Sequence, residues 1–120
     1  MLMLGGCNLL DCGDEVTQRE SRPDARGAAV VYVRNCGATT DYSTQVALIR
    51  HVDAPPRDGE VLFVVDGDHG AAPAGPGGGP VVRIRWIDVN HLEIAHDPRA
   101  RTFRHESAQG ALRVTYVPLP

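Results

Sequence analysis

The sequence predicts an all-β protein, either a small antiparallel β sandwich or an open barrel, with about seven short strands. Short apolar or alternating segments recur between turns, and 13 glycines and 9 prolines interrupt the 120 residues. No segment keeps the spacing of a long amphipathic helix, in which every third or fourth residue is apolar. These observations favour a core built from strands that turns and loops connect.

The strands are expected, in chain order, at residues 28–34, 44–50, 61–65, 81–88, 91–96, 102–106 and 111–117. A turn at 21–27 precedes the first strand, because its proline, aspartate and glycine each favour turn backbone. Residues 28–34 are apolar with little alternation, which is typical of a central strand covered on both faces. Residues 71–80 are glycine, proline and alanine and offer no large side chains for packing. We therefore expect a mobile surface loop there.

The other strands show three different patterns. Residues 44–50 and 111–117 carry apolar side chains at alternate positions, so each is expected to bury one face. Residues 61–65 are wholly apolar, whereas 102–106 are mostly polar. The last strand closes the predicted sheet.

The best-defined pair of strands is 81–88 with 91–96, because both alternate cleanly. Aligning their apolar residues opposes Trp86 with Leu92, Ile84 with Ile94 and Arg85 with Glu93. This register requires a three-residue connection at 88–90, in which Asn90 suits the left-handed backbone that commonly ends such a loop. We therefore predict an antiparallel hairpin with one ion pair on its solvent face.

The N-terminal segment differs from the rest of the chain. We expect a residual signal sequence and tether at 1–20, which joins the sheet near residues 15–18, followed by a single β domain at 21–120. Leu4-Gly5-Gly6-Cys7 resembles the lipobox of bacterial lipoproteins, whose cysteine becomes lipidated, and the resemblance implies a lipid on Cys7. A signal peptide also requires a charged start and an apolar stretch of about 7–15 residues, so we expect that the start was assigned too late or that the chain is truncated. The alternative is an ordinary apolar N-terminus with a free thiol.

The cysteine count agrees with this interpretation. With a lipid on Cys7, Cys12 and Cys36 remain as an even pair, which an extracytoplasmic protein is expected to oxidise. Closing a loop of this length adds roughly 3 kcal/mol in the chain-entropy model. The alternative is a cytosolic protein with three free thiols.

Most of residues 12–117 resemble a family of small bacterial lipoproteins of uncharacterised function. The similar segments are Cys36-Gly37-Ala38-Thr39-Thr40, Ser43-Thr44-Gln45-Val46, Asp66-Gly67-Asp68-His69-Gly70, and Asp97-Pro98-Arg99-Ala100-Arg101 with Phe103. The resemblance implies a lipid-anchored, extracytoplasmic protein of the bacterial cell envelope, and it implies no activity. Residues 23–32 and 85–94 are more weakly similar to the hairpins of β-propeller blades.

Two loops contain candidate site residues. Asp66, Asp68 and His69 are weak candidates for a divalent cation, since a calcium loop has more oxygen ligands and ends in a bidentate glutamate. The simpler interpretation is a turn, and no cofactor is expected. A possible recognition loop comprises Thr39, Thr40, Asp41, Tyr42 and Ser43. No Gly-x-Ser-x-Gly motif accompanies these hydroxyls, so no catalytic residues are assigned.

All 12 basic residues are arginine, yet the formal net charge is -3, and aromatic residues are few. Nucleic acid is therefore not an expected partner. The arginines considered for a basic face are Arg83, Arg85, Arg99, Arg101, Arg104 and Arg113. The simpler interpretation pairs this face with Glu93 and Glu106.

The function that these observations favour is a non-enzymatic structural or interaction domain. It is expected to be monomeric, tethered to a membrane through the lipid on Cys7, and in contact with an unknown envelope protein. The second candidate is a ligand- or metal-binding lipoprotein that uses the loops at 36–45 and 66–70. A small hydrolase is the third.

Overall fold

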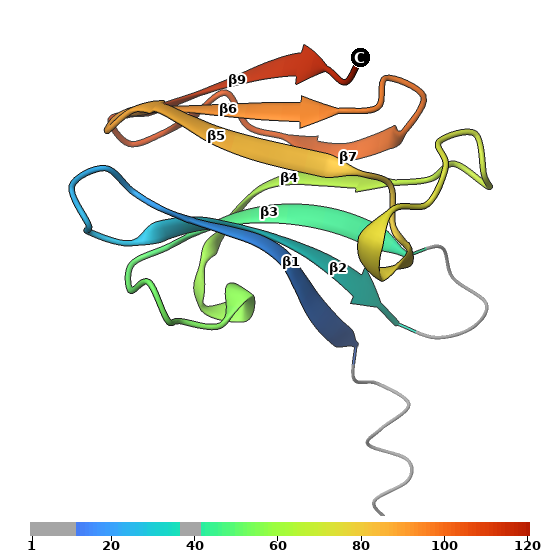
Figure 1. The fold of residues 1–120 in the computed structure, drawn as a ribbon, viewed down its shortest axis with the longest axis horizontal. Helices are drawn as coiled ribbons and strands as arrows, with labels where there is room; N and C mark the ends of the chain where they lie inside the picture. The colour runs from blue at the N-terminus through green and yellow to red at the C-terminus, as the bar shows by residue number, and fades with distance from the viewer. Residues whose placement is uncertain (1–11, 37–41) are drawn as a thin grey trace, which may run out of the picture.

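The computed structural model describes residues 12–36 and 42–120 of the chain, which form a pair of β-sheets packed face to face (Figure 1). The strands are β1 (Gly13–Ser21), β2 (Ala28–Asn35), β3 (Ser43–Ile49), β4 (Glu60–Asp66), β5 (Val82–Asp88), β6 (His91–His96), β7 (Arg101–His105), β8 (Ala108–Gln109) and β9 (Leu112–Pro118). Two short 3-10 helices are η1 (Pro56–Asp58) and η2 (Pro76–Gly78). One sheet has the order β1-β2-β3-β4-β7 and the other β5-β6-β9-β8. The predicted all-β fold is confirmed, as a sandwich.

Two features of the strand pairing differ from the prediction. Strand β1 forms the edge of the larger sheet, so residues 13–20 belong to the sheet and not to a tether. Its side chains are almost all exposed, which is why the sequence lacks an apolar pattern there. Strands β6 and β9 run parallel, whereas a wholly antiparallel fold was expected. The reason is the route of the chain. After β6 it crosses to the larger sheet and forms β7, and it then returns to the smaller sheet through β8 before β9 pairs with β6.

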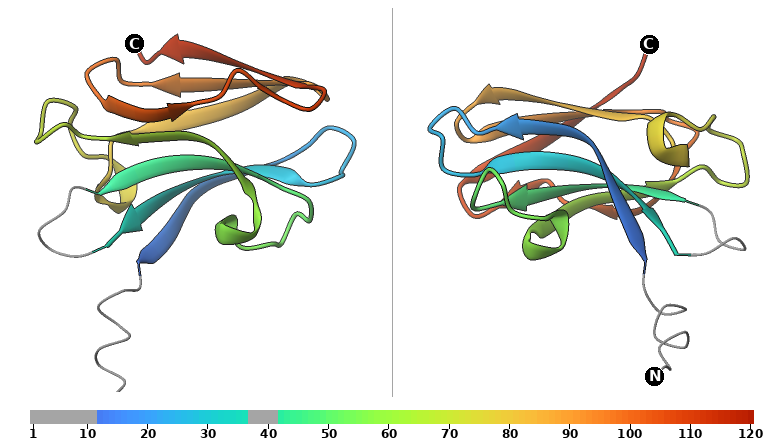
Figure 2. Two further views of the ribbon diagram at one scale, coloured as in Figure 1. Left: turned by 180° about the vertical axis from the view of Figure 1, so that it is seen from behind. Right: turned by 60° about the horizontal axis from the view of Figure 1, so that its bottom comes forward.

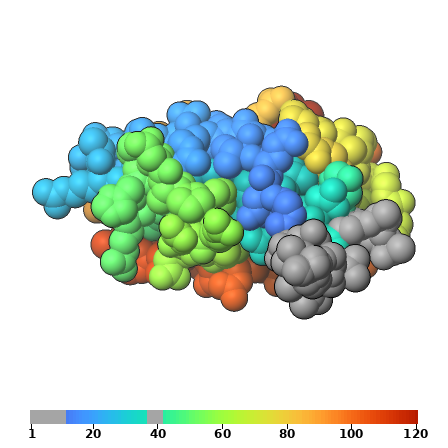
Figure 3. All heavy atoms as spheres, turned by 90° about the horizontal axis from the view of Figure 1, so that it is seen from below, coloured from blue at the N-terminus to red at the C-terminus, as the bar shows by residue number. Residues whose placement is uncertain are grey.

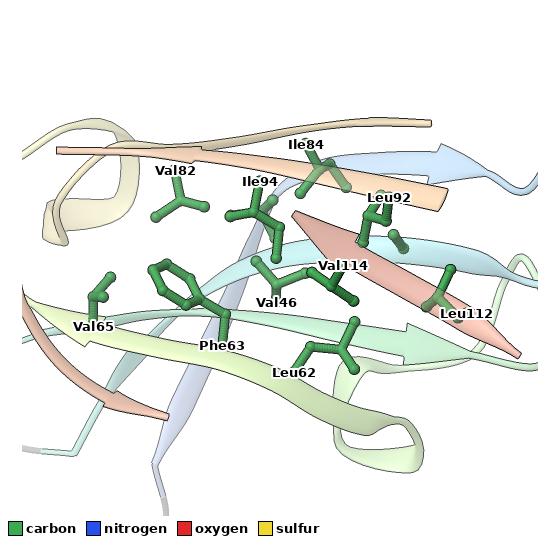
Figure 4. Packing of buried hydrophobic residues seen from close by; sticks show 12 residues of the cluster. Val46, Leu62, Phe63, Val65, Val82, Ile84, Leu92, Ile94, Leu112 and Val114 are labelled. Atoms are coloured by element: carbon green, nitrogen blue, oxygen red, sulfur yellow. The ribbon is translucent and has the colours of Figure 1, made fainter. Parts of the chain in front are cut away.

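The main core fills the space between the sheets (Figure 4). It combines Val46, Leu62, Phe63 and Val65 of the larger sheet with Ile84, Leu92, Ile94, Leu112 and Val114 of the smaller sheet. A second apolar cluster lies on the outer face of β2 and β3 and includes Val30, Tyr32 and Ile49. Strand β2 is therefore buried on both faces, as its uniform apolar sequence predicts.

The connection from β3 to β4 lies against the outer face of the larger sheet, shown in green in Figure 3. Arg19 holds this connection, because its Nη1 donates to the carbonyl oxygens of Val52 at 2.8 Å and Ala54 at 3.0 Å. Ala54 itself packs on the outer cluster. One exposed arginine of the edge strand thus fixes a loop that comes more than thirty residues later in the chain.

A side chain joins the two sheets along the β1 and β5 edges. The Gln18 carboxamide accepts from the backbone amide of Ile84 at 2.9 Å and donates to the carbonyl of the same residue at 3.0 Å. Nearby, Trp86 Nε1 donates to the carbonyl oxygen of Glu20 at 3.0 Å. The Gln18 bonds satisfy backbone groups at the edge of β5, and the Trp86 bond satisfies a backbone carbonyl of β1; these groups would otherwise be open to pairing.

The predicted register of the β5–β6 hairpin is confirmed, and Arg85 lies 3.1 Å from its cross-strand partner Glu93. The predicted connection is wrong. Asp88 pairs with His91, so the turn is shorter by one residue and a bulge falls before Asp88. Asn90 does not adopt positive φ; its backbone amide donates to Asp88 Oδ1 at 2.8 Å. An aspartate side chain therefore stabilises this turn without left-handed backbone.

The glycine- and proline-rich segment 71–80 was expected to lack packing partners, and this expectation is wrong. Ala74 pairs with Pro80, and Thr44 Oγ1 donates to the carbonyl oxygen of Pro80 at 2.6 Å. A Cβ atom on Gly79 would lie only 2.4 Å from Thr44 Oγ1. The absence of side chains is what lets this backbone approach the sheet so closely.

Gly79→Ala is expected to lower the free energy of unfolding by about 1–3 kcal/mol, because the added methyl group would overlap the buried Thr44 hydroxyl and push on Val33. Gly13→Ala is the matched control, since its new methyl would meet only Asn35 O at 4.0 Å. Chemical denaturation of both variants measures the difference. Equal stabilities would contradict the close packing of this segment.

Candidate functional site

The sandwich has two ends, which the strand register defines. At one end, Gly13 pairs with Asn35, and Ser43 pairs with Asp66; at the other end, Ser21 pairs with Ala28. We call the first the tether end, because the described chain begins there at Cys12, and the second the distal end. Figures 1 and 2 show these two ends on opposite sides of the molecule. The described residues of the predicted disulfide, cation site and recognition loop all lie at the tether end.

The predicted disulfide is present at the tether end. It joins Cys12, just before β1, to Cys36, just after β2, and closes a segment with a sequence separation of 24. Because β1 and β2 are adjacent and antiparallel, their open ends lie side by side, and the disulfide covalently closes them. Cys7, the predicted lipidation site, lies outside the described residues.

The predicted recognition loop is only partly described. Thr39, Thr40 and Asp41 lie outside the described residues. The ring of Tyr42 packs on Gly78, where an added Cβ would be 2.3 Å from the ring. Ser43 Oγ accepts from Gln45 Nε2 at 3.0 Å. Both described members of this loop therefore contact neighbouring parts of the fold.

The candidate metal ligands have a structural role. Arg101 donates to Asp66 through two hydrogen bonds, Nε to Oδ1 at 3.1 Å and a terminal nitrogen to Oδ2 at 2.6 Å. The backbone amide of Asp68 donates to Asp66 Oδ1 at 2.9 Å, and Asp68 and His69 adopt positive φ. Within residues 12–36 and 42–120, no group of three or more acidic, histidine or cysteine side chains is arranged to hold a metal.

Burial raises the pKa of the Asp66 carboxyl, but the hydrogen bonds from Arg101 and from the Asp68 amide outweigh it and hold the pKa below its ordinary value. A lowered pKa in the folded state means that the unfolded chain binds the proton more tightly. The resulting stability is present above about pH 4, the ordinary range of an aspartate. It is lost as the pH falls through the lower pKa of the folded state.

Asp66→Asn is expected to lower the free energy of unfolding by about 1–2 kcal/mol near neutral pH, because an amide cannot accept both Arg101 bonds. The difference from the wild type should shrink as the pH falls below about 4. Asp68→Asn is the control, since Asp68 lies 3.9 Å from Arg101 and is half exposed. Denaturation at several pH values measures both effects, and a difference independent of pH would contradict the assignment.

The arginines considered for a basic face do not gather on one surface. Arg83 and Arg85 lie on β5 of the smaller sheet, whereas Arg101 and Arg104 lie on β7 of the larger sheet. Four of the six form ion pairs: Arg85 with Glu93, Arg99 with Asp97, Arg101 with Asp66, and Arg104 with Glu106. These pairs include both of the glutamates that the sequence suggested.

The distal end contains a cleft that sequence reasoning missed. It has a volume of about 610 Å³ and lies between the β1–β2 turn, the end of β3, the start of β4 and the tip of β8 in the opposite sheet. Its lining includes Arg22, Arg26, Arg50, Asp58, Glu60 and Leu48. We call it the distal cleft. Its arginines come from segments more than twenty residues apart, so only the pairing of β2 with β3 brings them together.

The β1–β2 turn that carries two of these arginines is held on both sides. Arg22 donates to the carbonyl oxygen of Val89 at 2.7 Å and to Asn90 Oδ1 at 2.9 Å, and its guanidinium lies 5.5 Å from the Trp86 ring centre. Gly27 has φ of 106°, and a Cβ there would lie 2.2 Å from the Ile49 carbonyl oxygen. Only glycine permits this contact, which packs the turn against the end of β3.

Four charged side chains of the distal cleft form no ion pair within the described part of the chain. They are Arg26, Arg50, Asp58 and Glu60, and all four are exposed. Five other arginines do form such pairs, including Arg34 with Asp14 at 2.9 Å. The cleft thus displays charges of both signs that remain solvated in the folded chain.

No protein-family model matches this chain, and neither the curated proteins nor the solved structures include a significant match to it. None of the helices in the described residues is long and apolar enough to cross a membrane.

Proposed function

We propose that the protein is a membrane-tethered domain of the bacterial cell envelope that acts as a non-enzymatic interaction module. The anchor is a lipid on Cys7, and the partner is bound away from the membrane. The lipobox-like sequence at 4–7 supports the anchor.

The observation that carries the proposal is the disulfide between Cys12 and Cys36. Disulfides persist in oxidising compartments, such as the periplasm and the cell surface, and are rare in the cytosol. This disulfide lies where the chain leaves the sandwich toward Cys7. In the proposed arrangement, it closes the end of the domain that is attached to the membrane through Cys7.

The geometry also supports an interaction role. Cys7 precedes Cys12 by five residues, so an extended connection spans at most about 18 Å. The tether end would be held close to the membrane, and the distal cleft would face away from it. The lining of the cleft contains no serine, cysteine or histidine, the usual members of a nucleophile–base pair. Binding is therefore the role that its side chains favour.

Expression in a bacterium from the natural coding sequence, with the sequence upstream of Met1 included, tests the anchor. Mass spectrometry of the N-terminal peptide should find a lipid on Cys7, and the protein should fractionate with membranes. The Cys7→Ala variant should lack the lipid and be released. A soluble wild-type product with an unmodified Cys7 would refute the proposal.

The interaction role needs a second experiment. The folded domain, immobilised through the tether end, is incubated with solubilised envelope membranes, and bound proteins are identified after washing. The same domain unfolded by reduction and heat serves as the control. Repeated recovery of no protein specific to the folded domain would count against a protein partner.

A further inference from the structure

We infer that the distal cleft binds small zwitterionic ligands, namely amino acids or short peptides that carry both a carboxylate and an ammonium group. The inference rests on the interaction role proposed above and gives the chemistry of the ligand. It does not depend on the lipid at Cys7.

The cleft has the size of a ligand site. Its volume of about 610 Å³ falls within the range of roughly 300–1,000 Å³ that is usual for small-molecule pockets. Leu48 supplies apolar surface, charged side chains supply most of the lining, and Gln109 of the opposite sheet adds a carboxamide that can donate and accept hydrogen bonds. Most of the lining residues are charged or polar, so the cleft suits a ligand that is itself charged.

The charges select the class of ligand. Arg26 and Arg50 present guanidinium groups, which bind carboxylates through paired hydrogen bonds. Asp58 and Glu60 present carboxylates, which suit an ammonium group. A purely anionic ligand would also meet these two carboxylates, and a purely cationic ligand would meet the arginines. A ligand with one group of each sign complements both.

Arg26, Arg50, Asp58 and Glu60 have no ion-pair partner in the part of the chain that the structure describes. Each of them nevertheless lines a cleft that contains charges of the opposite sign. A ligand therefore need not displace an internal salt bridge in order to bind. Elsewhere on the surface, arginines close to carboxylates do pair, as Arg99 does with Asp97 at 2.7 Å.

The backbone around the cleft is held in place before a ligand arrives. Arg22 fixes the β1–β2 turn to the β5–β6 turn, and Gly27 packs it against β3. Arg19 fixes the segment that follows Arg50. Preorganisation of this kind lowers the entropic cost of binding. The arginines that hold the frame are therefore distinct from Arg26 and Arg50, which remain available to a ligand.

The test uses the purified, disulfide-bonded domain and three probes: trialanine with free ends, N-acetyl-trialanine, and trialanine amide. Binding is followed by amide chemical shifts in NMR titrations at millimolar peptide. We expect trialanine to shift resonances of the β1–β2 turn and of residues 48–60, and each blocked peptide to bind about tenfold more weakly or not at all. Higher ionic strength should weaken binding.

Variants separate the two halves of the site. Arg26→Ala combined with Arg50→Ala should lower the affinity for trialanine about tenfold, as should Asp58→Asn combined with Glu60→Gln. Arg57→Ala is the matched control, because Arg57 is exposed beside Asp58 but does not line the cleft. All substituted residues are exposed, so thermal unfolding should remain unchanged and should verify folding of each variant.

Absence of trialanine binding, or equal binding of the blocked and free peptides, would overturn the inference. Equal loss of affinity in the Arg57→Ala control would also overturn it, since charge in general and not the cleft would then be responsible. None of these results bears on the anchor, which is judged by the lipid on Cys7.

Discussion

Replacing Phe63 with alanine is expected to lower the free energy of unfolding by about 3–5 kcal/mol, the usual cost of removing a buried aromatic ring. Phe63 is fully buried on the inner face of β4, in the main core (Figure 4). The cavity left by the ring would lie between the two sheets, where strands of a sandwich cannot close together freely. For a domain of this size, the melting temperature should fall by roughly 10–20 °C.

The position of Phe63 explains why its loss should be so costly. Its ring centre lies 5.1 Å from those of His96 on β6 and Tyr116 on β9, and 6.1 Å from that of His105 on β7. His105 and Tyr116 stack at 3.6 Å. Phe63 thus connects strands of both sheets through one aromatic cluster. Tyr116 is also hydrogen-bonded to the Glu106 carbonyl oxygen, and burial followed by the charge of Glu106 raises the pKa of its hydroxyl.

The chain contains a natural control for this experiment. Phe103, the other of its 2 phenylalanines, is 61% exposed on β7. Phe103→Ala should change the free energy of unfolding by less than about 1 kcal/mol, since the exposed ring loses a contact with the Arg101 guanidinium at 5.2 Å. Phe63→Leu should recover most of the stability lost in the alanine variant, because it keeps most of the apolar volume. Chemical denaturation of the three variants measures the effects. Comparable losses at Phe63 and Phe103 would contradict the assignment of the core.

Removing the disulfide is expected to have the second large effect. Cys12→Ser combined with Cys36→Ser should lower the free energy of unfolding by roughly 3 kcal/mol, because the unfolded chain gains the entropy of an open loop. The melting temperature should fall by roughly 10 °C. Unfolding of the double variant should no longer respond to reductant, whereas the wild type should lose a similar amount of stability when reduced.

The single variants refine this test. Cys12→Ser and Cys36→Ser should each cost about as much as the double variant, since either change opens the same loop. Thiol labelling of the unfolded wild type should find both cysteines protected until reductant is added. If both thiols react without reductant and the variants keep full stability, the oxidising compartment loses its main support.

Local patterns in the sequence were sufficient for several features. Alternation over 81–88 and 91–96 predicts the hairpin register, because side chains on a strand alternate between its two faces. Aligning the apolar faces also places Arg85 opposite Glu93. The uniform apolar run in β2 predicts burial on both faces. The pairing of Cys12 with Cys36 follows from counting, once Cys7 is assigned to a lipid.

Other features left no local signal. Strand β1 is an edge strand with exposed side chains, so its sequence is polar. Its backbone hydrogen bonds to β2 hold it in place, and such bonds do not require a particular sequence. Segment 71–80 packs through its backbone, so its lack of side chains was misleading. The sequence around Asp66 resembles a metal site, but Arg101, 35 residues later, binds this carboxylate in the fold.

The sequence by itself determined the fold class, the β5–β6 register and the cysteine pair. The fold class and the register depend on the order of residues along the strands, and backbone geometry converts that order directly into faces and neighbours. The cysteine pair depends only on the number of cysteines that remain when Cys7 is set aside. Only the tertiary structure decided the parallel pairing of β6 with β9 and the assembly of the distal cleft. In the cleft, Arg26 and Arg50 are neighbours because β2 and β3 pair and Gly27 lets the turn approach β3. Such a site depends on contacts between distant segments, which the packing of the sheets creates.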